Sequence, residues 1–335
     1  MANDFKTIML LKCFTNKKYA QDFLDFGKLK FGNPQEWIEA WEKEGSGRGD
    51  LLEGSFASIA SIASIMKQDY IRKSKLYRLS RSNTIEMIDP RNGHIHFKSK
   101  DVLKLPTCCF FGLNDNMFTY MSKGEDGEKY PSGKIRKSYF KDFAKSLDKE
   151  TYKNCSEDEK PALIMINNPM EFRRRFVNYF ISNGLKPEEI FYAPVKYVDK
   201  DEEFFIESSI PTELFTKDIK FSNQSEIRIV LNTKNRNFLK MLNKSNGIIE
   251  LGNMSDIAKI EDYYFEDFIM QKRGNTLLYT LSIPKVEELP KDITDFFNSV
   301  KKTDTITAYQ TINGKRCPLT VERDNKTGKI IRIHP

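Results

Sequence analysis

Apolar residues recur along the first 31 positions in a pattern that predicts a strand, a helix and a second strand in succession. Residues 6–14 (KTIMLLKCF) form a short apolar run between polar residues, which is typical of a buried strand. Residues 19–26 carry aromatic side chains at helical spacing, and Gly27 then provides a helix end. Residues 28–31 (KLKF) alternate polar and apolar positions, so a short second strand is expected there.

A second helix is predicted to begin at Asn33-Pro34, because asparagine caps helix N-termini and proline fits the first turn. The glycine-rich residues 45–50 (GSGRGD) predict a loop. Residues 53–67 repeat serine, isoleucine and alanine with a three-residue beat, and this pattern leaves helix and loop equally open. Residues 75–110 predict several strands, with Asn92-Gly93 as a hairpin turn.

The rest of the chain continues as short strands with helices between them. Strands are predicted at 108–113, 163–166, 191–198, 226–231 and 247–251, and as a pair or triple over 305–333. Helices are predicted at 135–147, 168–181 and near 291–300, with a further short one capped by Ser255-Asp256. Few connections look like regular strand–helix–strand units, so the pattern predicts an α+β protein rather than a doubly wound parallel sheet.

Composition supports a packed protein with one large domain, or one domain and an appendage. The chain has 335 residues, 39% of them apolar and 30% charged, which is too apolar for a disordered chain. No apolar run reaches the ~20 residues of a bilayer span, and the longest candidate, residues 56–66, is interrupted by serine. Residues 1–12 contain an acidic residue and only a four-residue apolar run, which is unlike a signal peptide. A cytoplasmic protein without membrane contact is therefore expected.

The positions of cysteine and histidine give little support to a metal site or a histidine-activated nucleophile. The five cysteines stand at 13, 108, 109, 155 and 317 without a C-x-x-C pair, and the three histidines stand at 94, 96 and 334. A zinc site needs about four nitrogen or sulfur ligands at suitable spacing, and only His94 and His96 come close together. Two ordinary polar positions on one strand face explain this pair better, so no metal is expected.

The net charge of +7 is concentrated in three basic runs. Residues 67–82 carry six basic residues and one acidic residue, and residues 134–145 carry five and one, interleaved with aromatic residues. Residues 173–175 are three arginines. Cations beside aromatic rings suit a phosphate backbone and stacked bases, so a nucleic-acid partner is favoured over ordinary solvated faces.

Candidate chemistry centres on Gln224 and Glu226, which stand two residues apart at the entry of a predicted strand. Strand alternation would point both side chains to the same side. A carboxylate there can bind a ribose hydroxyl and stabilise a cationic sugar, while an amide can orient an incoming nucleophile. No G-x-G-x-x-G or G-x-x-x-x-G-K-[ST] pattern occurs, so the two commonest phosphate-binding loops are excluded.

Three segments together resemble the ADP-ribosyltransferase fold. They are FTNKKYAQDFLDFGKLKFG from residue 14, the RGD at 48–50 and the Q-x-E at 224–226. The pattern is similar to bacterial toxins of this fold that modify nucleic acids, with CmdT-like mRNA-modifying enzymes and DarT-like DNA ADP-ribosyltransferases as the nearest analogies. The resemblance covers roughly residues 6–54 and 215–256. It implies a split mixed sheet with helices in a catalytic domain over 1–256, followed by a small β-rich extension over 257–335.

The resemblance also implies roles for particular residues, with NAD as a substrate. Glu226 would be the catalytic glutamate, Gln224 would orient the target, and Arg48 would face the NAD phosphates or the reacting centre. The residues that the resemblance implies for NAD binding are Phe14, Thr15, Tyr19, Phe31 and Asn33. The stretch Lys12-Cys13-Phe14-Thr15 departs from the family, because many members have histidine or arginine at this strand end, and the usual Ser-Thr-Ser motif is absent.

The expected function is therefore NAD-dependent ADP-ribosyl transfer to a nucleic acid, with RNA favoured over DNA, by a toxin or anti-phage effector. Such a toxin would need a neutralising antitoxin or a chaperone as a partner. Two alternatives lack NAD chemistry. A metal-dependent nuclease would use Asp50 and Glu53, the compact carboxylate pair near the glycine-rich loop. A nucleic-acid-binding or interaction protein of a defence system would need only exposed basic and aromatic patches.

Overall fold

The computed structural model describes residues 7–44, 50, 52–59, 85–88, 94–124, 126–135, 153–202, 204–206, 211–262, 267–273, 276–282, 303–312, 315–324 and 330–334. It confirms an α+β protein with several sheets. The chain divides into two compact units, Met1–Ser282 and Ile283–Pro335, whereas the sequence placed a boundary after residue 256. Within the described residues, no helix has both the length and the apolar character needed to cross a bilayer.

The first unit is built on a six-stranded sheet with the order β10-β14-β6-β1-β9-β16. Its strands are β1 (Thr7–Phe14), β6 (Thr107–Asn114), β9 (Ala162–Ile166), β10 (Ile190–Pro194), β14 (Glu226–Leu231) and β16 (Ala258–Asp262). Every neighbouring pair in this sheet is antiparallel, so the predicted mixed sheet is wrong for these strands. The parallel pair that the structure describes lies outside the sheet, between β11 (Lys196–Val198) and β13 (Thr216–Asp218).

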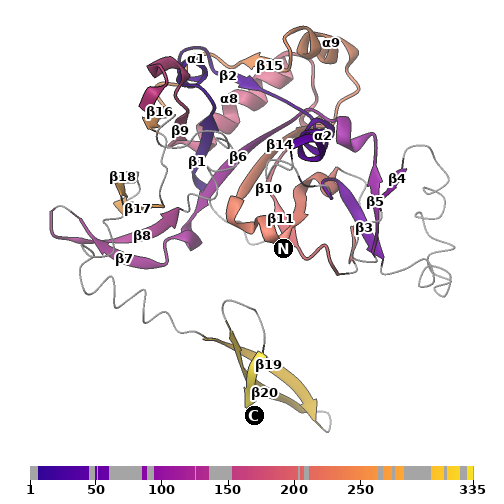
Figure 1. Ribbon diagram of the computed structural model, residues 1–335, viewed down its shortest axis with the longest axis vertical. Helices are drawn as coiled ribbons and strands as arrows, with labels where there is room; N and C mark the ends of the chain where they lie inside the picture. The colour runs from indigo at the N-terminus through magenta and orange to yellow at the C-terminus, as the bar shows by residue number, and fades with distance from the viewer. Residues whose placement is uncertain are drawn as a thin grey trace. The chain divides into compact units, whose positions relative to one another are not determined.

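The six-stranded sheet splits between β1 and β6. These two strands pair from Thr7 opposite Asn114 to Leu11 opposite Phe111, and their pairing ends there. Beyond that point β1 continues along β9 as far as Phe14, while the first residues of β6 follow β14. The C-terminal end of β1 and the N-terminal end of β6 therefore diverge (Figure 1).

Aromatic side chains fill the core on one face of this sheet. The covering helices are α1 (Lys17–Phe26), α8 (Pro169–Ser182) and α9 (Arg236–Lys244). Phe172, Phe176 and Phe180 follow a four-residue spacing along α8 and are fully buried. They contact Phe110 of β6 and Phe238 of α9 through tilted and edge-on ring pairs. Burial of each such ring contributes about 2–3 kcal/mol, so this cluster fixes the helices on the sheet.

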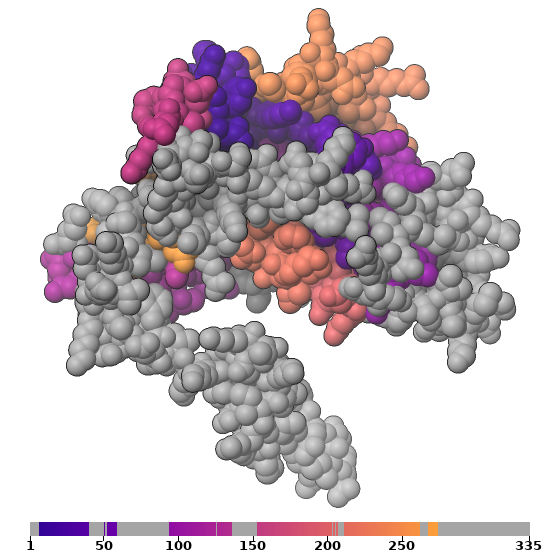
Figure 2. Space-filling model, viewed as in Figure 1, coloured from indigo at the N-terminus to yellow at the C-terminus, as the bar shows by residue number. Residues whose placement is uncertain are grey.

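Smaller sheets surround this core. Strand β2 (Lys28–Lys30) pairs with β15 (Ile248–Glu250), and their indigo and orange surfaces adjoin in Figure 2. A four-stranded sheet has the order β12 (Phe204–Phe205), β3 (Ser55–Ile59), β5 (Ile95–Ser99), β4 (Ile85–Ile88). Another has the order β18 (Thr276–Ser282), β17 (Phe268–Arg273), β8 (Lys129–Ile135), β7 (Tyr120–Lys123). The remaining elements are α2 (Pro34–Glu44) and the short helices η1 (Val102–Lys104), η2 (Asp115–Met117), η3 (Glu157–Glu159), η4 (Pro187–Glu189), η5 (Thr212–Phe215) and η6 (Ile219–Gln224).

Most local predictions of elements are confirmed, and three are wrong. Residues 55–59, for which helix and loop were open, form strand β3. The predicted strand over 191–198 is two strands, β10 and β11, interrupted at Val195. The predicted helix capped by Ser255-Asp256 is a turn. The predicted helices at 135–147 (beyond Ile135) and near 291–300, the turn residues Asn92-Gly93, and most of the loop at 45–50 lie outside the described residues.

The second unit contains a three-stranded antiparallel sheet, so of the pair or triple of strands predicted over 305–333 the structure has the triple. Its strands are β19 (Thr303–Ile312), β20 (Lys315–Asp324) and β21 (Ile330–His334). Ile312 lies opposite Lys315, the register expected for strands joined by the two residues Asn313-Gly314, a sequence typical of hairpin turns.

Candidate functional site

A cleft with a volume of about 1110 Å³ opens where β1 and β6 diverge. Residues 12–15 line one side of it and residues 107–110 line the other. Further lining comes from α1, β2, α2, β14 and β15, with an apolar rim formed by the exposed side chains of Tyr19, Met241 and Ile248. Ligand pockets commonly measure ~300–1,000 Å³, so the cleft is large enough for a ligand of dinucleotide size.

Five of the eight residues that the sequence singled out line this one cleft. They are Phe14, Thr15, Tyr19, Gln224 and Glu226.

The other three are placed differently. Phe31 is buried and packs edge-on against Phe180 at 5.6 Å between ring centroids. Asn33 caps α2, where its side-chain oxygen accepts a hydrogen bond from the backbone N–H of Glu36 at 3.0 Å. Neither of these side chains is part of the lining, and Arg48 lies outside the described residues.

Gln224 and Glu226 converge, but not by the strand alternation that the sequence suggested. Gln224 ends the short helix η6, and Glu226 begins β14. Ser225 between them has φ 40° and ψ 50°, a left-handed conformation that is uncommon outside glycine. The ammonium of Lys217 donates hydrogen bonds to both side chains, at 2.7 Å to Gln224 Oε1 and 3.1 Å to Glu226 Oε2. A turn and a shared cation therefore place the two groups together.

The turn at Ser225 is held by Gly112 of β6. The Ser225 hydroxyl donates to the Gly112 carbonyl at 2.7 Å, and the Gly112 N–H donates to the Ser225 carbonyl at 2.8 Å. A Cβ atom on Gly112 would lie 2.5 Å from Cγ1 of Ile227, so only glycine allows this close approach. Backbone strain of this kind persists where the surrounding contacts determine it, and it is frequent at functional sites.

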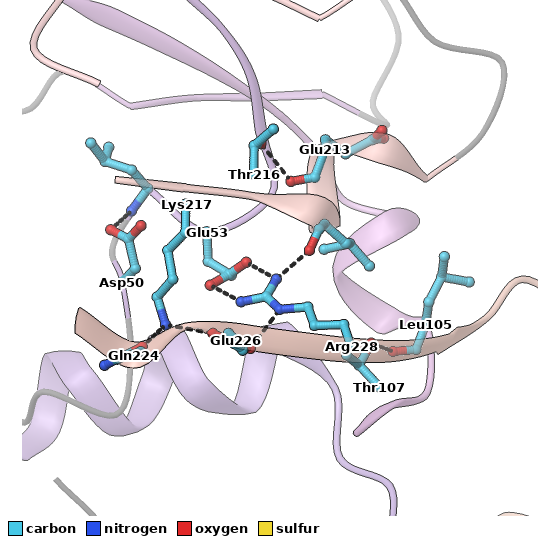
Figure 3. A network of polar contacts seen from close by, with 12 residues as sticks. Asp50, Glu53, Leu105, Thr107, Glu213, Thr216, Lys217, Gln224, Glu226 and Arg228 are labelled. Atoms are coloured by element: carbon cyan, nitrogen blue, oxygen red, sulfur yellow. Dashed lines mark hydrogen bonds and ion pairs between the residues drawn. The ribbon is translucent and has the colours of Figure 1, made fainter. Parts of the chain in front are cut away.

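The carboxylate of Glu226 lies between two cations at the wall of the cleft (Figure 3). Arg228 Nε donates to its Oε1 at 2.6 Å, and Lys217 donates to its Oε2 at 3.1 Å. Burial by itself would raise the pKa of Glu226, but the charges of Arg228 and Lys217 outweigh burial and hold that pKa well below its usual range. Glu226 is therefore ionised at neutral pH.

Arg228 connects Glu226 to a second buried carboxylate. Its guanidinium is fully buried and binds both oxygens of Glu53, the carbonyl of Leu214 and Glu226. Burial opposes its charge, yet the charges of Glu226 and Glu53 raise the pKa of Arg228 well above its usual value. The guanidinium also lies 5.7 Å from the ring of Trp37 in α2. This fork of contacts holds Arg228 rigidly and fixes the position of Glu226 Oε1.

The carboxylates of the nuclease alternative are each engaged by a cation. Asp50 pairs with the buried Lys200 at 3.4 Å, and Glu53 pairs with Arg228. Burial would raise the pKa of Asp50, but Lys200 and a backbone hydrogen bond lower it. In the part of the chain that the structure describes, no three His, Cys, Asp or Glu side chains gather in a way that could hold a metal ion.

Two further groups of the cleft extend its chemistry. The ammonium of Lys12 reaches across the split to the carbonyl of Cys109 at 2.8 Å and lies 4.9 Å from the ring of Phe110. Burial and the neighbouring Glu226 charge raise the pKa of the Cys109 thiol well above its usual value, so this thiol stays protonated and is a poor nucleophile. Sequence reasoning had noted Lys12 only as a departure from the family pattern.

In the described part of the basic runs, carboxylates neutralise some of the arginine charge, although Arg173 and Arg174 are exposed. In α8, Arg174 and Arg175 both pair with Glu171, and Arg175 also pairs with Asp256. Arg173 lies 5.6 Å from the ring of Tyr192. The run over 67–82 and residues 136–145 lie outside the described residues.

Comparisons with known proteins gave no match to any protein-family model, curated protein or solved structure. Functional inference therefore depends on the residues of the cleft.

Proposed function

We propose that this protein is an NAD-dependent ADP-ribosyltransferase that modifies nucleic acid, with RNA as the preferred target. One observation carries the proposal. The split of the six-stranded sheet opens a single cleft in which Gln224 and Glu226 share the lining with Phe14, Thr15 and Tyr19. These are five of the eight residues to which the resemblance assigned catalysis and NAD binding, and they come from two segments that are far apart in the sequence. The split between β1 and β6 supports an ADP-ribosyltransferase-like arrangement of the sheet.

The chemistry of the lining fits a dinucleotide. Aromatic rings at Tyr19 and Trp37 offer faces for a base or a nicotinamide, and lysine ammonium groups at positions 12, 28, 30 and 217 can bind a diphosphate. The ionised carboxylate of Glu226 can accept a hydrogen bond from a ribose hydroxyl. All these groups line one cavity that has room for the ligand.

In the proposed reaction, the glycosidic bond between the ribose and nicotinamide breaks, and its electron pair leaves with neutral nicotinamide. The carboxylate of Glu226 stabilises the positive charge that develops on the sugar. Gln224 orients the nucleophile of the target, which forms a new bond to the anomeric carbon and releases its proton to water. Neither residue is consumed, so the products are nicotinamide and the ADP-ribosylated target.

A nucleic-acid target agrees with the net charge of +7 and the sequence pI of about 8.9. The basic runs 67–82 and 134–145 are the segments that we assign to the phosphate backbone of the target. We place the activity in the cytoplasm, where NAD and RNA occur together. An ADP-ribosyltransferase acting on cellular RNA is toxic, so the proposal includes a neutralising antitoxin or chaperone partner and a role in toxin action or phage defence.

The test is incubation with NAD labelled in its adenylate part, together with separate pools of RNA, DNA and protein. Label is expected in RNA, and Glu226→Gln is expected to reduce labelling at least ~100-fold because the charge that stabilises the transition state is lost. Glu250→Gln is the matched control, since Glu250 also lines the cleft but has no role in the proposed reaction.

Retention of labelling by the Glu226→Gln variant would show that the assignment of the catalytic residue is wrong. Absence of label from all three pools, together with unchanged NAD, would remove ADP-ribosyl transfer altogether. Label in DNA or protein would keep the reaction and correct the target.

A further inference from the structure

Five side chains form one chain of polar contacts, in the order Glu53, Arg228, Glu226, Lys217 and Gln224, and all of them except Glu53 line the cleft (Figure 3). Two carboxylates face two cations in this chain, so its formal charges cancel. A neutral group of charges produces a weak field at the sugar that the proposed reaction makes cationic. While both cations neutralise the carboxylates, Glu226 therefore stabilises a cationic transition state less than it would with one cation removed.

The two cations differ in how firmly they are held. Arg228 has four acceptor oxygens, from three groups, around a planar guanidinium that is fully buried in the network. Among the described residues, Lys217 has two hydrogen-bond acceptors, Gln224 Oε1 and Glu226 Oε2, and both belong to the cleft lining. Lysine is also a point charge on a flexible four-carbon stem, whereas the arginine fork fits its partners in one orientation.

The Lys217 ammonium has other partners available besides Gln224 and Glu226. Its ammonium lies 4.9 Å from the ring of Phe221, whose face can hold a cation, and Lys217 itself lines the cleft. An anion in the cleft competes with Gln224 and Glu226 for the same ammonium. A diphosphate carries more charge than one carboxylate and offers more acceptor oxygens, so it is a strong competitor.

We propose that Lys217 is an anion-binding residue of the cleft, which leaves Gln224 and Glu226 when the diphosphate group of a dinucleotide binds. The identification of that ligand as NAD rests on the proposed function. Departure of Lys217 leaves two carboxylates against one guanidinium, and hence one net negative charge. It also uncovers Glu226 Oε2, while Arg228 keeps Oε1 in place. Binding of the phosphates thus makes the Glu226 carboxylate available to the sugar and releases the Gln224 amide to orient the target.

The experiment measures binding of ADP by isothermal titration calorimetry to the full chain and four variants. Lys217→Met is expected to weaken ADP binding ~10-fold, and Lys217→Arg is expected to retain most of it, because the positive charge is the ligand. Glu226→Gln removes the competing carboxylate and is expected to tighten ADP binding by about 3- to 10-fold. Glu250→Gln, a carboxylate of the same cleft that does not contact Lys217, controls for the general loss of negative charge.

Equal tightening in Glu226→Gln and Glu250→Gln would overturn the inference, because the effect would then be a general change of cleft charge. Unchanged ADP affinity in a folded Lys217→Met variant, as judged by its thermal midpoint, would also overturn it. If Lys217→Met does not fold, the comparison of Glu226→Gln with Glu250→Gln still decides, because the inference requires tightening in Glu226→Gln alone. The readout is separate from catalysis. ADP binding as expected without NAD consumption would support the anion site and reject the proposed function, and NAD consumption without these affinity changes would do the reverse.

Discussion

At the scale of single residues, the site depends on how buried charges are paired. Glu226 was singled out from sequence because its partner Gln224 is two positions away, and Arg228, which was missed, stands two positions further along the same strand. The other two charged groups of the network, Lys217 and Glu53, are not local in sequence. The short helix η6 separates Lys217 from Glu226 in the sequence. Glu53 is 175 positions before Arg228 and is connected to Glu226 through it. No spacing rule connects such residues, since the tertiary fold alone places them together. The presence of Gln224 and Glu226 in one cleft agrees with the sequence analysis, whereas the contacts of Lys217 and Glu53 were not predicted.

A buried histidine near the same region makes stability depend on pH. His96 of β5 is almost fully buried, and burial, with the charges of Lys200, His94 and Lys98, lowers its pKa to about 4, against the opposing effect of Asp50. The unfolded chain, with a histidine pKa near 6.5, binds more protons than the folded chain between these values. The free energy of unfolding is therefore expected to be constant above pH 6.5 and to fall as the pH drops below it.

This fall is measured by urea unfolding between pH 7.5 and pH 5, a window in which carboxylates contribute little. One group can give a slope of at most ~1.4 kcal/mol per pH unit. The variant His96→Phe keeps an aromatic ring beside Phe204 and is expected to flatten the profile. A wild-type profile that is already flat from pH 7.5 to 5 would contradict the assignment.

At the scale of elements, the sequence predicted features that depend on neighbouring residues, such as the ends of helices. Gly27, with φ 64°, ends α1, and Asn168 caps α8, as the sequence indicated. Strand β3 was missed because the three-residue repeat of residues 53–67 does not show the two-residue alternation of a half-buried strand. Its pairing partners, β5 and β12, come from distant parts of the chain and decide its conformation. The divergence of β1 from β6, which forms the cleft, depends on which residues of the strands pair with each other. Amino-acid composition does not reveal this pairing.

The contact between β6 and the turn at Ser225 gives a prediction at this scale. Gly112→Ala places a methyl group 2.5 Å from Cγ1 of Ile227, so the strands must move apart. We expect a loss of about 1–3 kcal/mol in the free energy of unfolding, measured by urea denaturation. The control is Gly32→Ala, where the new methyl group meets the end of the Glu36 side chain at 3.3 Å. Equal stability of the Gly112→Ala variant and the wild type would show that β6 does not constrain the turn.

At the scale of the whole molecule, the chain consists of a cleft-bearing unit and a small C-terminal unit. The sequence assigned residues beyond 256 to an extension, yet β16 pairs with β9 at the edge of the central sheet and β17 pairs with β8. Those pairings join segments far apart in sequence, so a reading based on a family resemblance that ended near residue 256 could not include them. The second unit, in contrast, was recognisable because its strands are consecutive and joined by clear turn signals.

Truncation distinguishes these two boundaries. A chain ending at Ser282 is expected to fold with a thermal midpoint close to that of the full chain, because it retains every strand of the first unit. A chain ending at residue 256 loses β16, β17 and β18 and exposes apolar residues that pack against them, including Ile135, Leu163 and Met165, so it is expected to aggregate or unfold. Circular dichroism melting and size-exclusion chromatography measure both. Equal stability of the two truncated chains would place the boundary at 256 instead.

The protonated thiol of Cys109 has a practical consequence for following the site. The charge of the Glu226 carboxylate contributes to the raised pKa of this thiol, and both groups line the cleft. The S–H stretching vibration absorbs in an infrared window that other protein groups leave almost clear, and its frequency responds to the charges around it. Subtracting the spectrum of a Cys109→Ser variant isolates this band, so the protein carries its own label-free probe of what happens at that carboxylate as ligands enter.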